Sequence, residues 1–115
     1  MRLAEYPNQL YVVINDLPER KEAEATVAEI QAMGRRSLFL PADVSNRGAV
    51  EAMMAGVVEH FGRIDIAVAN AAVSIRETVV DAKWENVQRT LEVAQFGVFH
   101  NCQLAARQMD SQPLS

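Results

Sequence analysis

The stretch Leu10-Tyr11-Val12-Val13-Ile14-Asn15, followed at once by Asp16, decides the fold class of this chain. An unbroken apolar, β-branched run is typical of a strand that is buried on both faces of a parallel sheet. Apolar residues then recur at helical spacing from Ala23 to Met33, and they follow Pro18, which suits the first turn of a helix. The sequence therefore predicts a strand at about 10–15 and a helix at about 19–33.

The same alternation continues to the end of the chain. Two further apolar runs predict strands at about 37–41 and 64–69, and helical spacing predicts helices at about 46–61 and 82–109. We expect Ser45 and Asp81 to cap these two helices, and Gly34 and Gly62 to end the first two. Strands that alternate with helices indicate a doubly wound, Rossmann-like α/β sheet, here a partial one. The second helix should bury one apolar face, formed by Val50, Met53, Met54, Val57, Val58 and Phe61.

Composition excludes several classes of function. The chain has 115 residues and a formal charge of −4, so it lacks the basic face that nucleic-acid binding requires. No apolar run is long enough to cross a membrane, and the N-terminal residues do not resemble an export signal. The only cysteine, Cys102, cannot form an internal disulfide, which is consistent with a cytoplasmic protein.

Other potentially reactive side chains have simple structural explanations. His60 and His100 lack neighbours at metal-ligand spacing, so we predict surface or packing roles and no metal site. Cys102 is expected to be a small buried residue, and Trp84 a packing anchor. The long helix at 82–109 should bury two faces. We expect residues 1–109 to form one domain and residues 110–115 a frayed tail.

Polar residues follow each of the three predicted strands. Asp16, Asp43 and Asn70 stand at the carboxyl ends, where open α/β sheets bind ligands. A carboxylate at Asp16 could accept both ribose hydroxyls of an adenosine and would repel a 2′-phosphate. Asp43 could accept from the adenine amino group, and the Val44 backbone could add contacts. Each residue could equally be a turn or a helix cap, so none is specific by itself.

The combination is more informative, because it resembles the short-chain dehydrogenase/reductase family. The resemblance runs without an evident gap from about residue 10 to 109. It rests on the following segments: Val-Val-Ile-Asn-Asp at 12–16, Leu-Phe-Leu-Pro-Ala-Asp-Val-Ser at 38–45, Phe-Gly-Arg-Ile-Asp-Ile-Ala-Val-Ala-Asn-Ala-Ala at 61–72, Trp84, Gly97-Val98-Phe99 and Ala105-Ala106-Arg107-Gln108-Met109.

The resemblance implies an NAD(P)-dependent oxidoreductase that transfers hydride at alcohol or ketone groups. Asp16 is similar to the acidic residue that selects NAD over NADP, since Leu17 and not an arginine follows it. Asp43-Val44 is similar to the pair that holds the adenine. Residues 69–72 resemble the family turn Asn-Asn-Ala-Gly, with alanine replacing its first and last residues. The implied cofactor-binding set is Asp16, Leu17, Asp43, Val44, Asn70, Ala71 and Ala72.

Two parts of the family site are missing from these 115 residues. A phosphate-binding glycine turn belongs about 20 residues before the acidic residue, whereas the first glycine here is Gly34. Family catalysis needs a tyrosine with a lysine four residues later, but Leu10 and Asn15 follow Tyr6 and Tyr11 at that spacing. The family's helix asparagine aligns with Ala94. No catalytic residue is therefore assigned. Residues 1–5 could be a remnant of the helix that follows the glycine turn.

The family strand order, 3-2-1-4-5-6-7, places the family's first strand between the strands at 10–15 and 64–69. Without that strand two interior edges stay unpaired. Three functions remain open. In the first, the chain is part of an NAD-dependent oxidoreductase and is inactive alone, with any NAD binding weak. In the second, it is a non-catalytic product that binds adenine nucleotide weakly, or that associates with itself or an intact paralogue through residues 82–109. In the third, it is a generic flavodoxin-like domain, which would leave the Asp43 and Asn70 signatures as coincidences.

Overall fold

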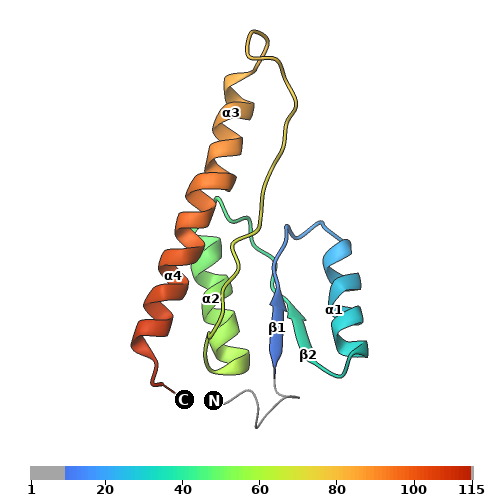
Figure 1. The fold of residues 1–115 in the computed structure, drawn as a ribbon, viewed down its shortest axis with the longest axis vertical. Coiled ribbons are helices and arrows are strands. Elements are labelled where there is room, and N and C mark those ends of the chain that lie inside the picture. The colour runs from blue at the N-terminus through green and yellow to red at the C-terminus, as the bar shows by residue number, and fades with distance from the viewer. Residues whose placement is uncertain (1–9, 115) are drawn as a thin grey trace.

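A computed structural model describes residues 10–114 of the chain. The elements are β1 (Tyr11–Ile14), α1 (Glu22–Ala32), β2 (Arg36–Phe39), α2 (Arg47–Phe61), α3 (Trp84–Leu91), a π-helical segment η1 (Glu92–Gly97) and α4 (Val98–Ser111). They form an α/β arrangement in which α1 lies on one side of the strands and α2 and α4 lie on the other (Figure 1). The suggested helix remnant at residues 1–5 lies outside the described residues.

The two strands pair in parallel, as the continuous apolar runs predict. The register places Tyr11 opposite Arg36 and Ile14 opposite Phe39. Pairing continues beyond the strands, because Leu40 N donates to Ile14 O at 3.0 Å and Ala42 N donates to Asp16 O at 3.1 Å. The carboxyl ends of both strands are thereby held next to each other, at the edge where ligands of such sheets bind.

The predicted strand at 64–69 is wrong for the described residues. This segment is extended, but no described strand pairs with it, and the sheet contains β1 and β2 alone. A strand exists only where a neighbour completes its backbone hydrogen bonds. Figure 1 shows the segment running upward from the end of α2 in the same direction as β1. The local sequence is strand-like, but among residues 10–114 no strand lies beside the segment to complete its backbone hydrogen bonds.

Helix α2 follows its predicted pattern closely. Val50, Met53 and Met54 are buried, and Val57 and Val58 pack against the same core. Gly62 ends the helix with φ of +84°, which glycine tolerates best, and Gly34 has φ of +82° after α1. The N-cap differs from the prediction: Asn46, not Ser45, accepts from Ala49 N through its side-chain oxygen at 3.1 Å.

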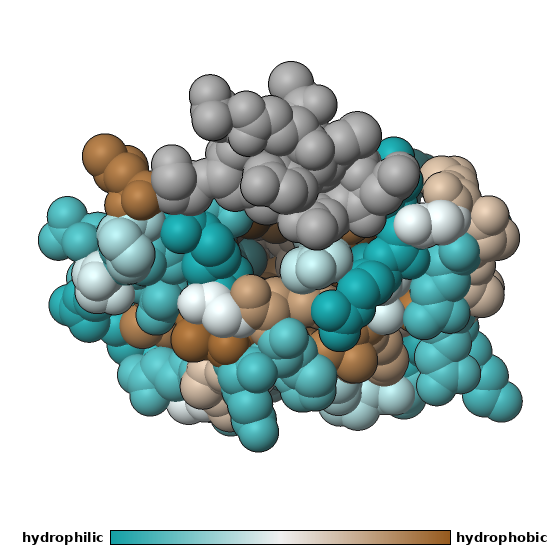
Figure 2. All heavy atoms as spheres, turned by 90° about the horizontal axis from the view of Figure 1, so that it is seen from below, coloured by the Kyte–Doolittle hydropathy of each residue, from teal (hydrophilic) through white to brown (hydrophobic). Residues whose placement is uncertain are grey.

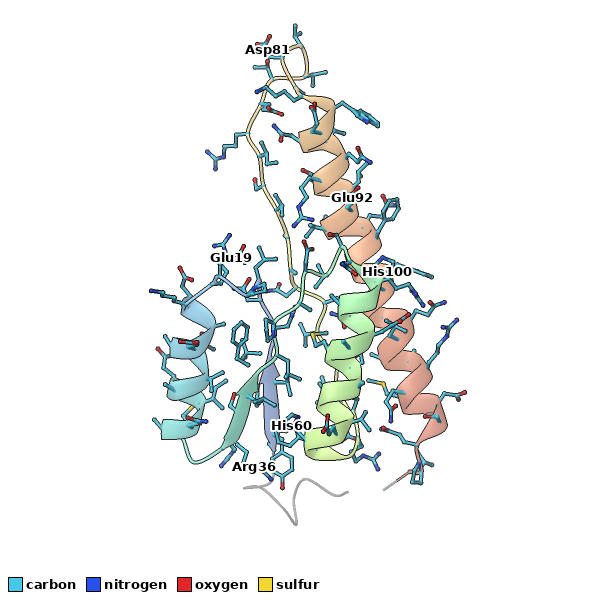
Figure 3. All side chains as sticks on the ribbon, turned by 180° about the vertical axis from the view of Figure 1, so that it is seen from behind. Glu19, Arg36, His60, Asp81, Glu92 and His100 are labelled. Carbon is cyan, nitrogen blue, oxygen red and sulfur yellow. The ribbon has the colours of Figure 1, made fainter. Side chains whose placement is uncertain are left out.

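The last helix starts later and ends later than predicted. It begins at Trp84 after Lys83, which caps it without a side-chain hydrogen bond, while Asp81 bonds to Thr78 in the preceding turn. Figure 3 shows Asp81 at the tip of the loop above the helix. Six residues from Glu92 are π-helical. Because α4 continues to Ser111 and Gln112 bonds to Ile64, residues 110–112 do not belong to an irregular tail.

Several burial predictions for this helix are wrong in the described structure. Trp84 is 70% exposed and Cys102 is exposed, so neither is a packing residue. Val93, Gly97 and Ala105 are buried, but the second predicted face is open. Met33 at the end of α1 is also exposed. Helical spacing identifies apolar faces correctly here, but it does not say whether a neighbouring element covers them.

The core lies between α2, the long helix and the residues that follow β2. It consists of Ala42, Val44, Val50, Met53, Met54, Ile64, Val93 and Ala105. His100 lies on the long helix beside α2 (Figure 3), where its Nδ1 is 3.1 Å from Arg47 Nη1. Among residues 10–114 no helix has both the length and the hydropathy of a membrane span.

Candidate functional site

Asn15 holds the ends of the two strands together. Its side-chain nitrogen donates to Leu40 O and to Ala42 O, each at 3.2 Å. A single amide therefore satisfies two backbone acceptors beyond the end of β2, where the ladder would otherwise stop. This contact fixes the position of the loop that carries Asp43 relative to Asp16. In the sequence, Asn15 is only a polar residue at the end of an apolar run, and its role in positioning this loop was not predicted.

Asp16 stands immediately beyond the carboxyl end of β1 and is half-buried. One carboxylate oxygen, Oδ1, accepts from Leu17 N at 2.8 Å. Among residues 10–114 the other oxygen, Oδ2, has no hydrogen-bond partner. Asp16 thus combines both readings of the sequence, since one oxygen supports the local turn and the other is available to a ligand. Leu17, also half-buried, contributes its backbone N–H to that turn.

Asp43 is at the centre of a polar cluster at the end of β2. Its Oδ1 accepts from Ser45 N at 3.0 Å and from Ser45 Oγ at 2.7 Å, while its Oδ2 accepts from Arg89 Nη2 at 3.0 Å. Burial by itself would raise the pKa of Asp43, but the hydrogen bonds from Ser45 and the Arg89 guanidinium hold that pKa below its usual value. The carboxylate is therefore ionised near neutral pH.

The same cluster attaches the long helix to the sheet. Arg89 comes from α3 and also donates to Ser45 Oγ at 2.7 Å. A carboxylate has about four lone-pair sites, and Oδ2 of Asp43 accepts only from Arg89 among the described residues. One position on that oxygen remains for a further donor, such as an amino group. Arg89 was not predicted, because nothing in the sequence links it to a residue 46 positions earlier.

Val44 is buried and packs against the π-helical segment. A Cβ on Gly97 would lie 2.7 Å from Val44 Cγ2 and 3.2 Å from Val44 O, so only glycine permits this approach. The backbone of residues 43–44 is consequently pressed against the long helix. Gly97 was noted in the sequence only as part of a family resemblance, and the close contact gives its physical reason.

Asn70, Ala71 and Ala72 stand apart from the other predicted residues. All three are exposed in an extended segment. No hydrogen bond among residues 10–114 joins their side chains to Asp16 or Asp43. The structure thus brings together the Asp16 and Asp43 ends of the predicted site and leaves the Asn70 turn open.

Fold and site together define a class, an open parallel α/β protein with acidic residues at adjacent strand ends. A family model described as enoyl-(acyl carrier protein) reductase matches residues 7–114. An L-rhamnose 1-dehydrogenase (NAD(P)(+)) of a Sphingomonas species is 34% identical over 98 residues, or 85% of this chain and 39% of the relative. A 3-oxoacyl-(acyl-carrier-protein) reductase of Staphylococcus aureus is 33% identical over 98 residues, or 85% of this chain and 40% of the relative.

Solved structures give the same result. A short-chain dehydrogenase from Burkholderia cenocepacia in complex with NADP superposes with a TM-score of 0.79 at 33% identity, covering 84% of this chain and 40% of that one. A Serratia marcescens short-chain dehydrogenase/reductase variant gives a TM-score of 0.80 at 29% identity, covering 86% and 40%. The chain belongs to the short-chain dehydrogenase/reductase family. It spans about two fifths of the length of these relatives.

Proposed function

We propose that the ends of β1 and β2 bind the adenosine half of a nicotinamide dinucleotide, with NAD preferred over NADP. The observation that carries this proposal is the position of Asp16 and Asp43 on adjacent strand ends, each with a carboxylate oxygen open to a further donor. Ribose hydroxyls and an adenine amino group are donors of the required kind. Leu17, Val44 and the turn at 70–72 complete the proposed binding set. An added 2′-phosphate would place negative charge beside Asp16.

Adenosine diphosphoribose and its 2′-phosphorylated form provide the direct test, because they lack the nicotinamide. Isothermal titration calorimetry with the 115-residue chain should give weak binding of the first compound and about tenfold weaker binding of the second, a difference of about 1.4 kcal/mol. Asp16→Asn should reduce this preference, and Asp16→Ala should remove binding. Asp81→Asn, at the distant loop tip, is the matched control. Equal affinity for both compounds would contradict the proposal.

We infer further that a longer protein containing this segment is an oxidoreductase acting on alcohol or ketone groups. The support is family membership, together with relatives that include an L-rhamnose 1-dehydrogenase (NAD(P)(+)) and a 3-oxoacyl-(acyl-carrier-protein) reductase. The 115-residue chain is proposed to be inactive by itself, because it holds no tyrosine followed four residues later by lysine. Absorbance of reduced nicotinamide should stay flat with NAD and a panel of alcohols.

A specific observation favours the alternative, in which the chain has no catalytic role and associates with another protein chain. The long helix exposes several large apolar side chains, and such residues mark contact surfaces when they gather on one face. They are Trp84 (70% exposed), Val87 (38%), Leu91 (43%), Phe96 (51%) and Phe99 (57%). We propose that this helix face, hereafter the helix 84–99 face, contacts a second copy of the chain or an intact paralogue.

A further inference from the structure

Arg47 joins the start of α2 to the long helix through the three nitrogens of its guanidinium group. Its Nη1 lies 3.1 Å from Nδ1 of His100, and its Nη2 donates to Gln103 Oε1 at 2.6 Å. Its Nε lies 3.5 Å from a carboxylate oxygen of Glu51, one turn further along α2. Arg47 and His100 are both half-buried and stand 53 positions apart in the sequence. The Arg47–His100 contact therefore connects two helices that are distant along the chain.

The geometry of this contact fixes the protonation state of His100. An arginine side chain has donors only and stays protonated in proteins, so Nδ1 of His100 must be the acceptor. The ring is then neutral and carries its proton on Nε2. A second proton would occupy Nδ1 and remove the acceptor from Arg47 Nη1, 3.1 Å away. It would also bring two positive charges together, and like charges at this separation repel each other.

The position of Arg47 in α2 makes the contact more sensitive to a further positive charge. Arg47 is the first residue of α2, and the first turn of this helix contains no acidic residue. The N-terminal end of a helix carries a partial positive charge, which disfavours cations. A protonated His100 would bring a second cation to the same end of α2. The dipole of α2 and the guanidinium of Arg47 therefore both favour the neutral form of His100.

Other charged groups around the contact give His100 no acidic partner, because among residues 10–114 no carboxylate forms an ion pair with it. The charged side chains on the surrounding elements are Glu51 and Glu59 on α2, Asp43 in the loop before it, Arg63 and Asp65 in the segment after it, and Arg89, Glu92, Arg107 and Asp110 on the long helix. The carboxylates of Glu51, Asp43 and Asp65 already pair with arginines. Glu59, Glu92 and Asp110 lie about two turns or more away along their helices.

We propose that the Arg47–His100 contact is a pH-sensitive connection between α2 and the long helix, intact while His100 is neutral and broken when His100 takes up a proton. An unperturbed histidine changes its charge near pH 6.5, at about the edge of the physiological range. The neutral ring is the form that accepts from Arg47. The contribution of the contact to stability is therefore present above the range in which histidine titrates, and it is lost as the pH falls through that range.

His60, near the other end of α2, provides an internal comparison. Its Nδ1 lies 2.8 Å from Gly56 O, and because a carbonyl oxygen only accepts, Nδ1 must donate. A second proton would enter at Nε2 and leave this hydrogen bond in place. His60 is exposed and remote from His100 (Figure 3), at the lower end of the molecule, where hydrophilic side chains surround a smaller apolar area (Figure 2). Of these two histidines, only His100 should lose a contact in acid.

The tautomers of the two histidines can be measured in the full 115-residue chain. Long-range ¹H–¹⁵N correlation spectra at about pH 7.5, above the range in which histidine titrates, show which ring nitrogen carries the proton. We expect the proton on Nε2 of His100 and on Nδ1 of His60. A proton on Nδ1 of His100 would overturn the proposal, because Arg47 could not then donate to that nitrogen.

Hydrogen–deuterium exchange measures the strength of the connection. Between about pH 7.5 and about pH 5.5, the protection factors of residues 50–54, corrected for the intrinsic exchange rate, should fall by about fivefold, the loss expected for one hydrogen bond. His100→Gln supplies an amide oxygen that accepts but does not titrate, so its protection factors should change by less than about twofold. Arg47→Met removes the cation, so protection should be low at both pH values.

His60→Gln is the matched control, because it removes the other histidine of the described chain and leaves the Arg47–His100 contact intact. It should lose protection in acid as the wild type does. Four results would overturn the proposal: no loss of protection in the wild type, equal losses in the wild type and His100→Gln, a loss in Arg47→Met as large as in the wild type, or a pH effect that disappears in His60→Gln.

Discussion

Asp43 shows how one residue serves both architecture and binding. Its carboxylate joins the end of β2 to α3 through Arg89 while retaining a position for a ligand. The two side chains are about a third exposed, so solvent screens the ion pair and its net contribution to stability is at most about 1 kcal/mol. The hydrogen bonds from Ser45 add to this, because they satisfy the same carboxylate from a second side.

Asp43→Asn should lower the free energy of unfolding by about 1 kcal/mol at neutral pH. The pKa of Asp43 is lowered in the folded chain, so the ionised form is the stabilised one. Its contribution is present above the ordinary aspartate pKa, near 3.9, and is lost as the pH falls through and below that value. Urea unfolding at neutral and acidic pH should therefore show the two proteins converging in acid.

Glu51→Gln is the control for this pH dependence. Glu51 pairs with Arg47 at 3.5 Å on the surface of α2 and its side chain is 57% exposed. Its replacement should lower the free energy of unfolding by less than about 0.5 kcal/mol. If the difference in the free energy of unfolding between wild type and Asp43→Asn stayed constant into acid, the carboxylate charge would not be what stabilises this loop.

Gly97 is the second residue whose role depends on one contact. In an open helix an alanine at this position would be favoured by about 1 kcal/mol over glycine. Here its Cβ would meet Val44 at 2.7 Å, and Val44 is buried and β-branched, so it cannot rotate away. We expect Gly97→Ala to destabilise the chain by about 1–2 kcal/mol in urea unfolding.

Gly56→Ala is the matched comparison. Its Cβ would lie 3.2 Å from Leu40 Cδ1, the far end of a flexible side chain, so helix propensity should offset most of the cost. Adding Val44→Ala to Gly97→Ala should recover part of the loss through a favourable coupling energy. If the two substitutions were simply additive, the proposed contact would not be the cause.

At the scale of elements, local patterns predicted β1, β2 and α2 well. The apolar run at 10–15 and the apolar face from Val50 to Val58 can be recognised in the sequence, because each element needs only one neighbouring surface to pack against. The Asn46 cap could not be separated from Ser45, since both residue types cap helices. The prediction at 64–69 failed because strand formation depends on a neighbour that no local pattern contains.

The π-helical segment was also invisible in the sequence, yet it explains the spacing of the exposed apolar residues. Trp84, Val87 and Leu91 are three and four residues apart, and the next large apolar residue on the helix 84–99 face is Phe96, five residues later. A π-turn closes i→i+5 bonds where an α-helix closes i→i+4 bonds. The wider step therefore keeps Phe96 aligned with the residues before it.

Gln112 provides a prediction at this scale. Its amide bonds to both backbone groups of Ile64, so it substitutes for a neighbouring strand at that residue. Gln112→Ala should leave both groups unsatisfied and reduce the free energy of unfolding by about 1–2 kcal/mol. Hydrogen exchange should rise at Ile64 and at the end of α4. Gln88→Ala on the exposed side of α3 should leave exchange at Ile64 unchanged.

At the scale of the whole molecule, the described chain is less compact than its length predicts. Its radius of gyration is 16.3 Å, whereas a domain of 115 residues scales to about 13 Å. The long helix and the extended segment beside it project beyond the rest (Figure 1). The core is correspondingly small and lies at one end of this helix, so much apolar surface stays open.

That open surface leads to the last prediction, that the 115-residue chain associates through the helix 84–99 face. Sedimentation velocity should show a concentration-dependent rise in the weight-average mass, because burying Phe96 and Phe99 removes apolar area from water at about 25 cal/mol per Å². Phe99→Lys should raise the protein concentration at the midpoint of association by about tenfold or more. Leu114→Lys, at a fully exposed residue outside this face, is the control. A mass that stays monomeric at all concentrations, or association weakened equally by both variants, would rule out this face as the contact.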